Sequence, residues 1–187
     1  MTTPTPTVNA NSRAIAGREC GSCSLCCKVY AISELEKPAG IWCSHCKPGR
    51  GCAIHDALPT QCIEFNCLWR TEASIGPDWK PDRSKMVVTI SPVNGYINVQ
   101  VDGSAPQAWR KQPYYGQLHQ WARNNLQKGI YVLVFINDNA TLIMPDQEIL
   151  LGPMLPTDGI AVRRAGNAYE ARLIPGGIAI PPAALPG

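Results

Sequence analysis

The sequence predicts an α+β protein in which a small cysteine-rich module, stabilised by metal, precedes a β-rich part with one amphipathic helix. The first observation is that all nine cysteines of the 187-residue chain lie between Cys20 and Cys67. The second is that the later part alternates short apolar segments with turn residues, as strands and their connections do. The third is one longer segment, near residues 113–128, whose apolar residues recur with helical spacing.

The abrupt end of the cysteines near Arg70 predicts a boundary in the chain. Thr, Pro, Asn and Ala dominate the first residues, which predicts a flexible tail, and Gly76, Pro77 and Pro81 are typical of a connector. The expected parts are a flexible tail (1–17), a cysteine-cluster metal-binding module (18–70), a connector (71–85), an α+β domain (86–174) and a loose tail (175–187).

The α+β part is expected to open with a β-hairpin. Residues 86–90 and 96–101 are rich in Val and Ile, and in the second segment apolar and polar residues alternate with a period of two. Pro92 and the Asn94-Gly95 pair between them supply turn residues.

One helix and several strands should complete this part. Pro113 suits the first position of a helix, and Lys128 and Gly129 suit its end. Between them, Tyr114, Leu118, Trp121, Ala122 and Leu126 form a helical stripe. Further strands are expected near residues 130–136, 141–144, 148–151, 160–163 and 169–174.

Composition and charge limit the classes of function. The chain is 45% hydrophobic and 17% charged, which is enough to bury a core. The net charge is only +3 and the cysteine-rich part carries no basic stripe, which disfavours a nucleic-acid partner. The N-terminus lacks the features of a secretory signal, and no apolar run approaches the ~20 residues that span a bilayer. We therefore expect a soluble, cytoplasmic protein without a membrane partner.

In a reducing compartment, dense cysteines indicate metal binding or redox chemistry rather than disulfides. The first group, Cys20, Cys23, Cys26 and Cys27, has the spacing C-x2-C-x2-C-C. Cysteines two residues apart can bind one ion from a tight turn. If the segment is helical instead, Cys20, Cys23 and Cys27 share one face of the helix. The adjacent Cys26 and Cys27 point in different directions, so they suit two neighbouring metals or two corners of a cluster. A ferredoxin proper is excluded, because the next cysteine and the Cys-Pro pair are missing.

The second group comprises Cys43, Cys46, Cys52, Cys62 and Cys67. Cys43-x2-Cys46 is half of a common thiolate site, and His45 inside it is either a ligand, a hydrogen-bond donor to a thiolate or a surface turn residue. Zinc and iron both suit thiolate ligands, so the cofactor is expected to be zinc or iron, the iron either alone or in a 4Fe-4S cluster. Trp42, Phe65 and Trp69 are expected to shield the metal from water.

These residues resemble the YkgJ-type cysteine-cluster family, whose CxxCxxCC signature belongs to a zinc- or iron-chelating domain. The matching blocks are CGSCSLCC at 20–27, GCAIH at 51–55 and LPTQCIEFNC at 58–67. The family has Tyr where His55 stands and Arg where Leu58 and Ile63 stand. The resemblance implies a ligand set of seven cysteines, which Cys43 and Cys46 extend: Cys20, Cys23, Cys26, Cys27, Cys52, Cys62 and Cys67.

Several functions remain open at this point. The leading hypothesis is a protein that chelates metal ions for structure, storage or electron transfer. The alternatives are a metal- or iron–sulfur-dependent enzyme of redox or group-transfer chemistry, a zinc-built interaction module, and a thiol redox sensor. The sequence names no substrate and no protein partner. The lone helical His119 is more typical of a structural residue than of a catalytic one.

Overall fold

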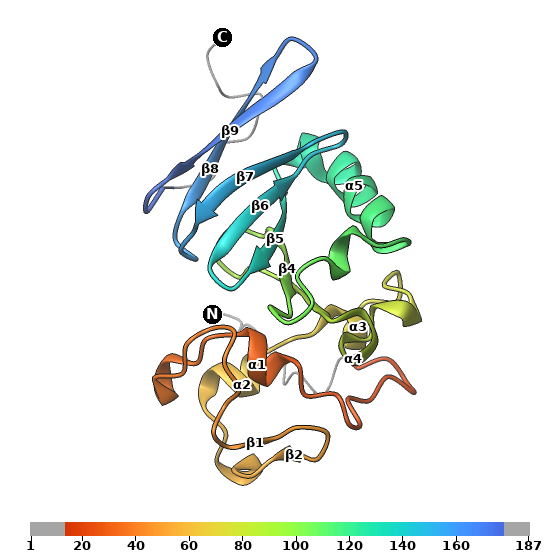
Figure 1. Ribbon diagram of the computed structural model, residues 1–187, viewed down its shortest axis with the longest axis vertical. Coiled ribbons are helices and arrows are strands. Elements are labelled where there is room, and N and C mark those ends of the chain that lie inside the picture. The colour runs from red at the N-terminus through yellow and green to blue at the C-terminus, as the bar shows by residue number, and fades with distance from the viewer. Residues whose placement is uncertain (1–13, 178–187) are drawn as a thin grey trace, which may run out of the picture.

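The computed structural model describes residues 14–177 and confirms the α+β fold class. Helices and a five-stranded mixed sheet occur together, and the cysteine-rich region forms the N-terminal part of the chain (Figure 1). Most of the two expected tails, residues 1–13 and 178–187, lies outside the described residues.

The central sheet has the strand order β3-β4-β5-β6-β7. Its strands are β3 (Met86–Ile90), β4 (Ile97–Val101), β5 (Val132–Ile136), β6 (Asn139–Ile143) and β7 (Glu148–Pro153). All neighbours pair antiparallel except β4 and β5, which are parallel. A parallel pair needs a long crossover, and the chain between these two strands forms that crossover with the main helix.

The main helix, α5 (Tyr114–Asn125), lies against one face of the sheet (Figure 1). Pro113 is its N-cap, so the expected helix start is confirmed. Its buried residues Leu118 and Ala122 join the apolar side chains of that face. Two 3-10 turns flank the helix, η5 (Ala108–Arg110) and η6 (Leu126–Lys128).

A separate hairpin covers the opposite face. Its strands β8 (Gly159–Ala165) and β9 (Ala168–Ile174) pair antiparallel. Ile160 and Val162 pack there with Leu133 and Leu142 of the central sheet, forming a second apolar cluster. β8 is buried over residues 159–162 and exposed or partly buried after them, whereas β9 alternates exposed and partly buried residues over most of its length.

The N-terminal part contains only short elements, because its cysteines, prolines and glycines interrupt any longer periodic segment. They are α1 (Cys26–Val29), η2 (Ser33–Leu35), β1 (Cys46–Lys47), β2 (Gly51–Cys52), η3 (His55–Ala57), α2 (Thr60–Glu64), α3 (Leu68–Thr71), η4 (Pro77–Trp79) and α4 (Pro81–Ser84). The strands β1 and β2 form a two-stranded sheet of their own.

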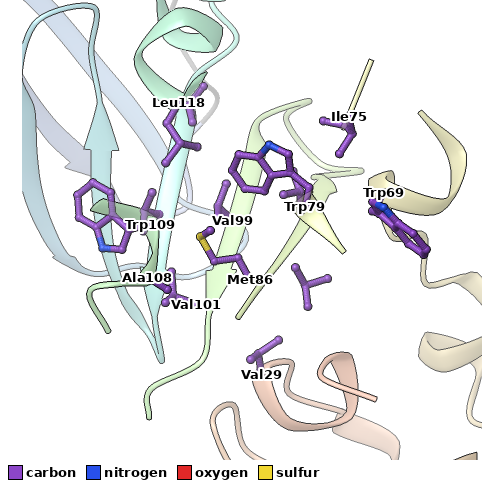
Figure 2. Close-up of a cluster of buried hydrophobic side chains, with 14 of the residues drawn as sticks. Val29, Trp69, Ile75, Trp79, Met86, Val99, Val101, Ala108, Trp109 and Leu118 are labelled. Atoms are coloured by element: carbon purple, nitrogen blue, oxygen red, sulfur yellow. The ribbon is translucent and has the colours of Figure 1, made fainter. Parts of the chain in front are cut away.

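One hydrophobic core joins the cysteine-rich part to the sheet. Val29 and Trp69 from the N-terminal part belong to the same buried cluster as Met86 and Val99 of the sheet and Leu118 of α5 (Figure 2). The cluster thus crosses the boundary that the cysteine distribution indicated. The N-terminal part therefore obtains its apolar packing from β3 and β4 rather than from a core of its own.

An ion pair adds a polar connection across the same junction. Lys28 Nζ lies 2.6 Å from Asp102 Oδ1, and the Asp102 side chain is only 10% exposed. Ser104 donates to the same oxygen from its backbone N–H at 2.9 Å and its hydroxyl at 2.8 Å. Burial by itself raises the pKa of Asp102, but the bonds from Lys28 and Ser104 outweigh it and lower that pKa below its ordinary value.

We expect Asp102→Asn to reduce the free energy of unfolding at neutral pH by about 1–3 kcal/mol, because Lys28 would keep only a neutral partner. A carboxylate with a lowered pKa in the folded state stabilises above its unfolded pKa, and this contribution disappears as pH falls through the folded pKa. The difference between wild type and variant should therefore shrink below about pH 4. Denaturant titration at neutral and acid pH measures it. Asp146→Asn, at a side chain that is 85% exposed, is the control and should cost little; an equal loss in both variants would contradict the prediction.

Within residues 14–177, no helix has both the length and the apolar character needed to cross a membrane.

Candidate metal centre

The nine cysteines are all free thiols and lie on several short elements. Cys26 and Cys27 begin α1, Cys46 lies on β1 and Cys52 on β2. Cys62 lies on α2. No two of them are joined as a disulfide. The thiols are thus available as ligands.

Four cysteines line one cavity of ≈ 50 Å³, and we name them the pocket cysteines: Cys20, Cys23, Cys26 and Cys67. The rest of the wall is largely apolar and comprises Phe65, Trp69, Arg70, Pro81 and Val87. Phe65 and Trp69 thus occupy the place that the sequence suggested for shielding residues. Trp42, in contrast, does not line this cavity and is 40% exposed.

Backbone N–H groups lie near two of the pocket sulfurs. Cys67 is the N-cap of α3, and the N–H of Arg70 donates to its carbonyl at 2.9 Å. Burial raises the pKa of Cys67 to about 11, with the nearby N–H groups of Trp69 and Arg70 acting in the opposite direction. Burial likewise raises the pKa of Cys23, against N–H donors from Leu25 and Asp82. N–H groups near a sulfur favour the charged thiolate, which is the form that binds metal.

The other five cysteines surround the β1–β2 hairpin, and we name them the hairpin cysteines: Cys27, Cys43, Cys46, Cys52 and Cys62. The N–H of Cys43 donates to the carbonyl of Cys27 at 3.0 Å, and the N–H of Cys46 to the carbonyl of Cys43 at 3.0 Å. Cys46 and Cys52 are direct partners in the β1–β2 ladder. The backbone therefore brings four of the five into one loop cluster.

The hairpin sulfurs perturb one another. A hydrogen bond with Cys26 and then burial raise the pKa of Cys27 strongly. Burial, followed by the charge of Cys27, raises the pKa of Cys46 to about 11. Burial and the charges of Cys27 and Cys43 raise the pKa of Cys62. Neighbouring thiols are hard to deprotonate together because their negative charges would repel one another. A bound cation offsets this repulsion and favours the thiolate forms.

A buried cation lies beside the hairpin cysteines. Lys37 is 8% exposed, and its ammonium donates to the carbonyls of Lys28 at 3.1 Å, Pro38 at 2.9 Å and Tyr30. Burial lowers the pKa of Lys37, while the charges of nearby cysteines, Cys43 and Cys27 foremost, act to raise it. Sequence reasoning missed this residue, because the lysine lies outside every cysteine spacing pattern.

The two histidines of the module are placed differently. His45 is half-buried between Cys43 and Cys46, and its carbonyl accepts the N–H of Ala53 at 2.8 Å. His55 lies exposed on η3. Neither histidine lines the cavity of the pocket cysteines.

As the side chains stand, no three His, Cys, Asp or Glu residues between residues 14 and 177 form a set that could hold a metal ion. The donor chemistry still fits zinc or iron, because four thiols line one mostly apolar cavity. Comparison with models of known families, with curated proteins and with solved structures finds no match for this chain. The ligand assignments of the sequence therefore stay predictions.

Proposed function

We propose that this protein binds zinc or iron through its nine cysteines, the iron either as an ion or in an iron–sulfur cluster. One observation carries the proposal: three free thiols of the segment 20–26 and a fourth from the distant Cys67 line a single, mostly apolar cavity. Four thiolates are the ligand set of structural zinc and of the common iron–sulfur clusters.

The thiol pKa values favour metal binding over redox sensing. Sensor cysteines have lowered pKa values and stand exposed, so that the thiolate reacts readily. Here the pKa values of Cys23, Cys27, Cys46, Cys62 and Cys67 are all raised. Thiols of this kind stay protonated without a cation and lose their protons when one binds.

A bound metal would supply the attraction that holds the sulfurs together, and its binding would stabilise the fold. The pocket and hairpin cysteines would be its ligands. Arg70 in the cavity wall and the buried Lys37 would offset part of the negative charge that several thiolates carry. The proposal includes the cytoplasm as location, since nine thiols persist there without forming disulfides. It also includes membership of the YkgJ-type family, which is supported only by the three matching sequence blocks.

Anaerobic purification followed by elemental analysis and visible spectroscopy tests the proposal. We expect zinc or iron to copurify with the chain; a brown colour and acid-labile sulfide would identify an iron–sulfur cluster, and a colourless zinc protein a simple ion site. The control is the same chain alkylated at its thiols before metal loading, which should bind none. A fully reduced, folded chain that takes up neither metal, before or after reconstitution, would overturn the proposal.

A further inference from the structure

We propose that the nine cysteines form two separate metal centres, one built by the four pocket cysteines and the other by ligands from the five hairpin cysteines. This inference rests on the proposed function and adds the number of centres and the pairing of their ligands. Each set has at least the four cysteines that a tetrahedral ion or a four-iron cluster requires as thiolate ligands.

The pocket cysteines are a set by virtue of their common cavity. The N–H of Cys23 donates to the carbonyl of Cys20 at 2.9 Å, which is the tight turn of a C-x2-C pair. Cys67 completes the set from the start of α3. None of the hairpin cysteines lines this cavity. Four sulfur ligands around one cavity are enough for one metal centre, so this centre needs no ligand from the hairpin cysteines.

Trp69 gives an independent sign of a ligand in that cavity. Its side chain lines the cavity and the residue is 8% exposed, yet its indole Nε1–H finds no acceptor among residues 14–177. A buried donor without a partner costs free energy. Metal-bound thiolates and the sulfides of a cluster are acceptors, so an occupied pocket centre would satisfy this group.

The hairpin cysteines are a set by virtue of backbone bonds that do not involve the pocket. The ladder pairs Cys46 with Cys52, and bonds from Cys43 and Cys46 link this hairpin to Cys27. Cys62 reaches the group from α2, whose first N–H groups, at Thr60 and Gln61, bond to the carboxylate of Glu34 at 3.1 Å each. The set has one thiol more than a tetrahedral ion uses.

The division runs between two adjacent residues, Cys26 and Cys27. Successive side chains on a helix point about 100° apart, so neighbours at the start of α1 can serve different centres. Because the two residues are adjacent in the chain at the start of α1, the two centres would lie next to each other. Cys26 and Cys27 do not fit one tetrahedral ion together, and this assignment lets each of them bind a different centre.

Cobalt(II) titration of the reduced chain tests the division, because tetrahedral cobalt–thiolate sites absorb strongly in the visible range. We expect the wild type to bind two cobalt ions, and two double variants to bind one each: Cys20→Ser with Cys23→Ser in the pocket set, and Cys46→Ser with Cys52→Ser in the hairpin set. Ser22→Ala and Ser44→Ala are the matched controls. Both serines are exposed, lie within the same C-x2-C segments, and should leave two ions bound.

Saturation of the wild type at one ion, or loss of all cobalt binding in a double variant that keeps its circular dichroism spectrum, would overturn the division. Native mass spectrometry of the unaltered chain during zinc loading makes the test independent of variant folding. It should show a singly and then a doubly loaded species; a chain that stops at one zinc ion contradicts two centres. A wild type that binds neither cobalt nor zinc would instead overturn the proposed function itself.

Discussion

If the protein binds metal as proposed, removal of that metal is expected to unfold residues 20–67 while the centre of the sheet stays folded. The short elements of this region cover few apolar side chains of their own, and structural zinc in small peptides contributes roughly 10–16 kcal/mol of apparent binding free energy. Without the metal, the crowded thiols and short helices would be held mainly by the packing of Leu25 and Val29 on the sheet and by the ion pair of Lys28. The strands β5 and β6, by contrast, are paired on both sides and buried on both faces.

Hydrogen–deuterium exchange of metal-loaded and chelator-treated protein measures this effect. Amides of α1, β1, β2 and α2 should lose protection, while those of β5 and β6 keep it. Reloading with metal should restore the protection of the amides in α1, β1, β2 and α2. This step controls for damage by the chelator. Uniform loss of protection across the sheet, or no loss in the module, would show that metal and module folding are not linked in this way.

Trp79→Ala is expected to lower the free energy of unfolding by about 3–5 kcal/mol, the range for a large aromatic residue removed from a core. Trp79 is 1% exposed and stacks on Trp121, with ring centroids 4.8 Å apart. Tyr114 contacts it edge-on at 4.9 Å, and its indole N–H donates to Gln117. The residue joins η4 to α5 in the shared core, so a cavity there weakens both (Figure 2).

Two controls separate cavity formation from a general sensitivity to mutation. Trp79→Phe keeps part of the packing and should cost clearly less than the alanine variant. Val93→Ala, at a side chain that is 64% exposed, should change stability by no more than about 0.5 kcal/mol. Thermal or denaturant unfolding at constant metal occupancy is the measurement. An alanine variant as stable as Val93→Ala would show that the core tolerates the loss of this ring.

The local patterns predicted the strands and the main helix well. The segment expected at 86–90 is β3, and the period-two pattern of residues 97–101 is β4. The antiparallel pairing of these strands confirms the hairpin around Asn94-Gly95. Such features depend on neighbouring residues alone, so a single sequence contains the information that determines them.

Pairing between distant segments could not be predicted. The parallel register of β4 with β5, with Ile97 opposite Val132, depends on how α5 returns the chain to the sheet. The helices of the module have only four or five residues, too few for a helical period to show. Packing decides both features, and packing is a property of the folded chain.

The candidate site shows the same division between local and distant information. The C-x2-C spacing allowed either a turn or a helix at Cys20–Cys23, and the structure has the turn. No spacing rule, however, could place Cys67 in the cavity with Cys26, or Lys37 beside the hairpin cysteines, because the intervening chain determines both. The resemblance to the YkgJ-type family suggested which cysteines act as ligands but not how they group.

The shared core has a consequence for the way this protein is made. Leu25 and Val29 pack in one cluster with Val87 and Val99, which the ribosome adds several seconds later at ~5–20 residues per second. During that interval the thiols of the nascent chain are exposed to oxidants and to competing ions, because the strands that shield them do not yet exist. If the protein binds metal as proposed, we expect the supply of reductant and metal during translation to determine how many chains fold correctly.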